Sequence, residues 1–140
     1  MIQYNFKPTE NGIESTFNFS DIRHYGLLQA NLRDLGIPSE LAIFSSPDGI
    51  YSESFARMII NSSEEELNSA LLDLAAVEIA LINRGWHEHC GSYVAAVSRE
   101  TAEKLWNNDG FVVKIGENDT IALVEFRGTA AELLRILESL

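Results

Sequence analysis

The stretch from Ser62 to Gly85 constrains the fold of this chain more than any other. Ser63 is placed to cap the free N–H groups of a helix start, and Glu66, three residues later, can complete a capping box. Strong helix formers fill most of the positions that follow, and Gly85 suits the left-handed position after a last turn. The sequence therefore predicts one helix that is about 33 Å long.

The second half of this predicted helix, residues 71–82, is apolar on nearly every side. A helix that is apolar all round is buried on several sides. We therefore expect the rest of the 140-residue chain to pack around it. A chain of this length is typical of one domain, so a single α+β domain over residues 1–140 is predicted.

Strand and helix signals recur in the same order in two parts of the chain. Residues 13–85 and residues 92–140 each read as strand, helix, strand, strand, helix. Helices that follow antiparallel strand pairs are typical of α+β proteins. The pattern predicts a mainly antiparallel sheet covered by helices, and two ferredoxin-like βαββα units around the long helix would satisfy it. Ile2–Phe6 is expected to add a strand, and 86–91 to form a connection.

The two parts also share the joint between their last strand and last helix. Ser63 and Glu66 open one helix, and Thr129 and Glu132 open the other with the same spacing. An ancient duplication would explain this pseudo-repeat. Chance is the alternative, because capping boxes are common.

The charge of the chain limits its partners. It carries 21 acidic and 10 basic residues, a formal net charge of −11, and the excess is spread along the sequence. Such a chain is a poor match for nucleic acid or an anionic membrane, whereas a basic protein partner would be attracted. The acidity can also serve solubility alone.

Features of export and membrane insertion are not expected either. Asp73 and Glu78 interrupt the longest apolar run, so no membrane span is predicted. The first residues lack the basic and apolar segments of a signal peptide, and Cys90 is the single cysteine. These observations favour a cytoplasmic location.

Glu78 is the most unusual residue of the long helix. Leu67, Leu71, Leu74 and Ile82 share its helical face, so its carboxylate should be partly desolvated. A carboxylate in such surroundings is a candidate for a ligand pocket. The alternative is a structural carboxylate that accepts hydrogen bonds at the edge of the packed face.

A second candidate is the run His87-Glu88-His89-Cys90. On an extended segment His87 and His89 point the same way and could share a metal ion. A zinc site needs a third and usually a fourth ligand, and the sequence offers no second cluster. We therefore expect no metal site, with His87 and His89 as weak candidates.

The two tryptophans are candidates for either partner contact or the core. Trp86, just past a helix end, is assigned here to partner binding, since tryptophan is enriched at binding hot spots. Trp106, beside Leu105 at the end of a shorter helix, is expected in the core.

Together these features predict a small acidic protein-binding protein. The leading hypothesis is an inhibitor or immunity-type protein that neutralises a basic, nuclease-like protein partner through Glu64, Glu65 and Trp86. An acidic adaptor or secretion-type chaperone fits about as well, and a small-molecule pocket around Glu78 is the other alternative. No nucleotide loop or nucleophile motif is found, so neither an enzyme nor a cofactor is predicted.

Overall fold

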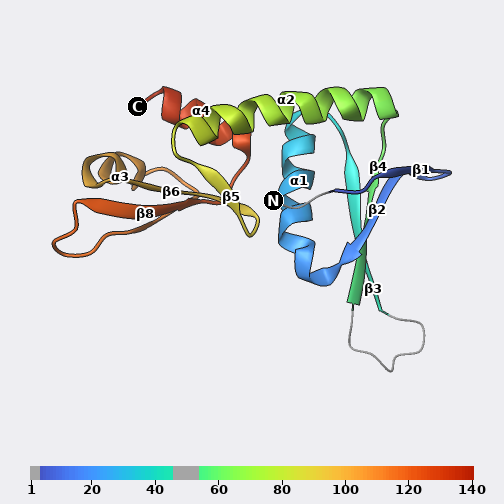
Figure 1. Cartoon of the computed structure of the whole chain (residues 1–140), viewed down its shortest axis with the longest axis horizontal. Helices are drawn as coiled ribbons and strands as arrows, with labels where there is room; N and C mark the ends of the chain where they lie inside the picture. The colour runs from blue at the N-terminus through green and yellow to red at the C-terminus, as the bar shows by residue number, and fades with distance from the viewer. Residues whose placement is uncertain (1–3, 46–53) are drawn as a thin grey trace. The chain divides into compact units, whose positions relative to one another are not determined.

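The chain consists of two compact units, residues 1–73 and residues 74–140. The computed structural model describes residues 4–45 and 54–140 of them. Each unit has its own four-stranded antiparallel sheet, and helix α2 (Glu64–Asn83) begins in the first unit and ends in the second (Figure 1). The predicted α+β class with mainly antiparallel pairing is therefore confirmed. That the whole chain forms one domain stays a prediction.

In the first unit, two hairpin-forming strands precede each helix. Its elements are β1 (Lys7–Thr9), β2 (Gly12–Asn18), the short 3-10 helix η1 (Phe19–Asp21), α1 (Ile22–Asp34), β3 (Ser39–Ser45), β4 (Ser54–Ile60) and the first part of α2. The strands pair antiparallel in the order β1-β2-β4-β3.

Alternation along β2 directs its side chains to the core of this unit. Ile13, Ser15 and Phe17 are buried, as the period of a half-buried strand requires. Phe17 stacks on Tyr25 of α1 with 3.6 Å between ring centroids. The buried Ser15 hydroxyl is 2.9 Å from the Tyr25 hydroxyl, so both polar groups are satisfied inside an apolar layer.

The second unit repeats this order of elements. After the end of α2 it contains β5 (His87–His89), β6 (Ser92–Ser98), α3 (Arg99–Leu105), β7 (Phe111–Lys114), β8 (Ile121–Phe126) and α4 (Ala130–Glu138). Its strands pair antiparallel in the order β5-β6-β8-β7, which matches the first sheet strand for strand. The ferredoxin-like detail of the prediction is not confirmed.

Register and capping match as well as strand order. Ala56 of β4 pairs with Phe17, and Ala122 of β8 pairs with Val97, at corresponding places in the two sheets. Thr129 caps α4 by accepting the Glu132 N–H at 3.2 Å. In the first unit Ser63 accepts the Glu66 N–H at 3.1 Å. The units thus have equivalent positions that can be compared directly, while common ancestry stays a hypothesis.

Each part of α2 leaves one of its sides exposed. In the first unit Leu67 and Ala70 are in the core, whereas Leu72 is 73% exposed. In the second unit Leu74 and Leu81 are in the core, whereas Ile79 is 57% exposed. The expectation that this helix is buried on several sides is therefore wrong. In a unit made of one sheet and a helix layer, a helix contacts the sheet with one face only. An apolar composition does not by itself place another layer on the opposite face.

Two local predictions differ from the structure, and a third concerns residues that the structure does not describe. Residues 4–6 form no strand, and β1 lies instead at Lys7–Thr9, because it pairs with β2 across a turn at Glu10–Asn11. Residues 87–89, expected in a connection, form β5 for the same reason. The expected turn at 46–49 lies outside the described residues. Among the described helices, none has the length and apolarity needed to cross a membrane.

Candidate functional site

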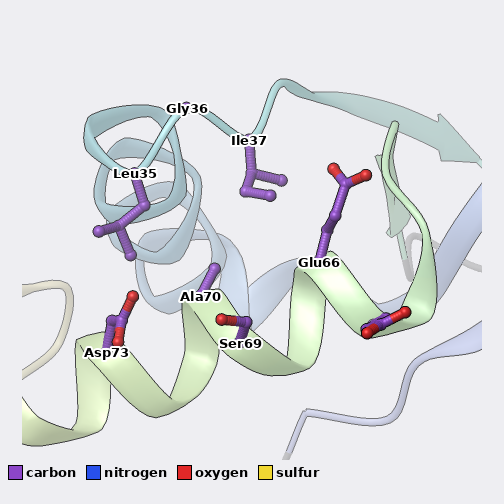
Figure 2. Close-up of a pocket in the computed structure, with 8 residues that line it drawn as sticks. Leu35, Gly36, Ile37, Glu66, Ser69, Ala70 and Asp73 are labelled. Carbon is purple, nitrogen blue, oxygen red and sulfur yellow. The ribbon is translucent and has the colours of Figure 1, made fainter.

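An open hollow with a volume of about 440 Å³ lies in the first unit (Figure 2). The first half of α2 forms one wall and the segment after α1 forms the other. The lining residues are Leu35, Gly36 and Ile37 from that segment, and Glu65, Glu66, Ser69, Ala70 and Asp73 from α2. One wall is thus largely apolar, and the other carries three carboxyl groups.

A Schellman motif at the end of α1 builds the apolar wall. The N–H of Gly36 donates to the Arg33 carbonyl at 3.0 Å, and the N–H of Ile37 donates to the Leu32 carbonyl at 2.9 Å. Gly36 adopts a φ of 81°, which favours glycine. The motif turns the chain sharply, so Leu35 and Ile37 face α2 across the hollow (Figure 2).

Helical spacing builds the acidic wall. Glu65, Ser69 and Asp73 follow one another at intervals of four residues, so they form a row along one face of α2. Glu66 lies beside this row. Its backbone N–H is bound to Ser63, while Figure 2 shows its side chain directed toward the hollow. The Ser63 half of the predicted capping box is therefore confirmed, and the Glu66 side chain is one of the hollow's carboxylates.

Among the described residues, no ion pair involves the carboxyl groups of Glu65, Glu66 and Asp73. Residues 1–73 contain eleven acidic and four basic residues, so a cation approaching this unit is attracted by the unit as a whole.

The second unit shows that the fold does not require this row of acids. In α4 and at its C-cap, the positions equivalent to Glu65, Ser69 and Asp73 hold Ala131, Arg135 and Ser139. Capping and core positions, in contrast, are alike: Ser63 and Thr129, Glu66 and Glu132, and Leu67 and Leu133 correspond. The acid at position 66 therefore follows the capping pattern, whereas those at positions 65 and 73 are particular to the hollow.

The structure places the three residues predicted to contact a partner in different surroundings. Glu65 lines the hollow, and Glu64 is exposed at the first position of α2 without lining it. Trp86 is 2% exposed, with its ring centroid 6.3 Å from that of Phe111. Since its side chain is not available at the surface, we correct its assignment from partner contact to the core. Trp106, expected in the core, is 61% exposed.

Glu78 belongs to the second unit and is half-buried. The buried Tyr93 hydroxyl donates a hydrogen bond to Glu78 Oε2 at 3.4 Å. Burial raises the pKa of Glu78, the Tyr93 hydrogen bond partly offsets this, and the nearby Glu88 carboxylate raises it further. Glu78 does not line the hollow of the first unit. A structural carboxylate between α2 and β6 is the interpretation that these contacts favour.

His87 and His89 lie on β5 and are both exposed. As expected for an extended segment, they alternate with Glu88, whose Oε1 accepts the Gly91 N–H at 3.0 Å. Cys90 is exposed, and its sulfur is 3.7 Å from His89 Nε2. Within the described residues no group of three or more His, Cys, Asp or Glu could hold a metal ion. The absence of metal binding stays a prediction.

Comparison of the chain with protein-family models, with curated proteins and with solved structures found no match.

The sequence indicated the acidic wall of the hollow, at the start of the long helix, but it did not indicate the apolar wall. A signal for the apolar wall was present in the sequence. Gly-Ile-Pro at the end of an amphipathic helix predicts a sharp turn with a buried residue after the glycine, and this describes Gly36 and Ile37. The row through Ser69 and Asp73 was visible from spacing, but nothing in the sequence indicated which segment faces it.

The raised pKa of Glu78 predicts a pH dependence of stability. Because the folded state holds the Glu78 proton more tightly than the unfolded state, Glu78 contributes stability at low pH. That contribution is lost as the pH rises from about 4.5, the ordinary value, through the raised pKa. We expect Glu78→Gln to remove this loss, so that the variant gains stability over the parent as the pH rises. Urea unfolding at a series of pH values measures the difference.

Glu125 offers a control of opposite sign. A hydrogen bond from Ser92 lowers the pKa of Glu125, and Arg127 adds to this lowering. Its contribution is therefore present at neutral pH and lost as the pH falls, so Glu125→Gln should lose stability relative to the parent as the pH rises. Glu78→Gln and Glu125→Gln curves that run parallel to each other would contradict the assignment of Glu78.

Proposed function

We propose that this chain is a small acidic protein-binding protein and that its hollow receives a basic segment of a protein partner. The observation that carries the proposal is the set of three carboxylates, Glu65, Glu66 and Asp73, which form no ion pair among the described residues and lie opposite an apolar wall. The action is binding rather than catalysis, and the proposed location is cytoplasmic.

The chemistry of the two walls indicates the kind of side chain that fits. Lysine and arginine place their aliphatic stems on apolar surface while their charged heads reach polar groups. In the hollow, Leu35 and Ile37 offer the apolar surface, and Glu65 and Asp73 offer the acceptors. A basic, nuclease-like protein is the partner class that we propose, with the chain acting as its inhibitor in the manner of an immunity protein. The adaptor or secretion-type chaperone would use the same surface.

Affinity capture from the native host, followed by mass spectrometry, identifies the partner. The decisive comparison is then between the parent and the Glu65→Gln/Asp73→Asn double variant. We expect the double variant to bind at least about tenfold more weakly, because each lost charge-assisted contact is worth about 1.5–3 kcal/mol. The association rate of the parent should fall as salt rises, since opposite charges steer the encounter.

A matched control separates the hollow from net charge. Glu100→Gln/Glu117→Gln also removes two negative charges, but from exposed positions of the second unit. This control should leave the affinity for the partner nearly unchanged. Equal weakening by both double variants would reduce the role of the hollow to general acidity. A captured partner that binds the Glu65→Gln/Asp73→Asn variant as tightly as the parent would reject the proposal.

A further inference from the structure

The polar side chains of the hollow are evenly spaced along its acidic wall. Glu65, Ser69 and Asp73 follow one another at intervals of four residues on α2, and all three are exposed. At a rise of about 1.5 Å per residue, each interval is about 6 Å and the whole row is about 12 Å long. The hollow therefore presents a carboxylate at each end of the row and a hydroxyl group midway between them.

An extended chain has nearly the same spacing. Its residues advance about 3.3 Å each and its side chains alternate between two sides, so every second side chain lies on the same side, about 6.6 Å from the next. The first, third and fifth residues of an extended segment thus span about 13 Å, which matches the row from Glu65 to Asp73. A helix with every fourth residue facing the row would match it as well, so the spacing alone does not distinguish the two conformations.

The size of the hollow favours the extended conformation. When its volume of about 440 Å³ is spread over the row's length of about 12 Å, the mean cross-section is about 37 Å². An extended chain with its side chains occupies about 50 Å², the product of the spacing between strands and the spacing between stacked sheets. A helix is roughly 10–12 Å across with its side chains, which corresponds to about 80–110 Å². An extended segment therefore fills the hollow and projects only slightly from it, whereas a helix would lie mostly outside the two walls.

The apolar wall receives the side chains that point the other way. In an extended segment the second and fourth side chains are directed away from the row on α2. They face Leu35 and the backbone turn at Gly36 and Ile37 (Figure 2). Leu35 supplies most of the accessible apolar surface, because it is 38% exposed and Ile37 is 6% exposed. Apolar residues at these two positions of the segment remove Leu35 from water, and basic residues there would face no carboxylate of the row.

We propose that the partner's segment binds in the hollow as an extended chain with the order basic, apolar, small polar, apolar, basic. This rests on the proposed function, because it specifies the basic segment that the hollow receives. The two basic side chains pair with Glu65 and Asp73, and the middle side chain is a hydroxyl that meets Ser69. The two apolar side chains contact Leu35. The Glu66 carboxylate, beside Glu65, adds to the negative charge at that end of the row.

Two synthetic peptides of identical composition and charge test the spacing. One is Arg-Val-Ser-Val-Arg and the other is its isomer Val-Arg-Arg-Ser-Val, both with capped ends. In a calorimetric titration at low salt, we expect the full chain to bind the first at least about tenfold more tightly, because adjacent arginines of an extended segment point to opposite sides and only one reaches the row. The Glu65→Gln/Asp73→Asn variant, changed at exposed positions, should bind both weakly and equally. The Glu100→Gln/Glu117→Gln control should keep the preference.

A third peptide tests the conformation. It is a capped, alanine-rich helical peptide with two arginines eight residues apart, so it has the spacing of the row but the width of a helix. We expect it to bind at least about tenfold more weakly than Arg-Val-Ser-Val-Arg, because most of it lies outside the two walls. Equal or tighter binding of the helical peptide, equal binding of the two isomers, or no binding of either isomer at millimolar concentration would overturn the proposal. The proposed function is tested separately, since it is rejected by a captured partner whose binding does not depend on Glu65 and Asp73.

Discussion

Replacing Trp86 with alanine is expected to lower the free energy of unfolding by about 3–5 kcal/mol, the range for a large aromatic side chain removed from a packed core. The side chain is 2% exposed and contacts Phe111 of β7 edge-on. Its position is held by the backbone, because the Trp86 N–H donates to the Leu81 carbonyl at 2.9 Å in the Schellman motif that ends α2. Truncation leaves a cavity that this fixed backbone cannot close. Urea denaturation followed by circular dichroism measures the loss.

Trp106 is the matched control within the same unit. It is 61% exposed at the C-terminal end of α3, so Trp106→Ala should change the free energy of unfolding by no more than about 0.5 kcal/mol. The sequence analysis placed Trp106 in the core and Trp86 at a partner contact. The comparison of the two variants therefore tests that assignment directly. A larger loss for Trp106→Ala than for Trp86→Ala would contradict the assignment of Trp86 to the core and of Trp106 to the surface.

The tryptophans show why local pattern misjudges some burial. Trp86 follows Gly85, and in a Schellman motif the residue after the glycine folds back on the last turn of the helix. Ile37 follows Gly36 in the same way at the end of α1, and it is buried too. Helix-end chemistry was therefore the informative signal for Trp86. Proximity to Leu105 was a poor one for Trp106, because neighbours in sequence point to different sides of a helix.

Element order and class were predictable because they depend on local signals. Capping at Ser63 and Thr129, alternation along β2, and glycines at helix ends each act over a few residues. The strands β1 and β5 were not predictable in the same way. Each is three residues long and exists through pairing with its neighbour, which period and propensity over so short a run do not reveal.

In the candidate site, too, only the part that depends on local signals was predictable from the sequence. The acids of α2 were visible in the sequence, and Glu65 was among the predicted contact residues. The apolar wall was not, because the approach of Leu35 to α2 depends on how α1 and α2 pack within the first unit. The second half of α2 is the complementary case: its apolar composition indicated burial on several sides, whereas the structure leaves Ile79 and Ile82 exposed.

Two leucines of α2 provide the second large effect. Leu74 and Leu81 lie seven residues apart on the inner side of the helix and are 8% and 1% exposed. Leu74→Ala and Leu81→Ala are each expected to cost about 2–5 kcal/mol, the sum of lost transfer free energy and the cavity left behind. Leu81 should lie toward the upper end of this range, because its carbonyl also accepts the Trp86 N–H and the local backbone is least free to relax.

Ile79→Ala is the matched control for both leucines, since it also truncates a large aliphatic side chain of α2 within the second unit. Because Ile79 is 57% exposed, the expected loss is no more than about 0.5 kcal/mol. Both tryptophans lie in the second unit, so their fluorescence during urea unfolding reports on the unit that contains Leu74 and Leu81. Equal, small losses for all three variants would mean that Leu74 and Leu81 do not lie in the core of the second unit.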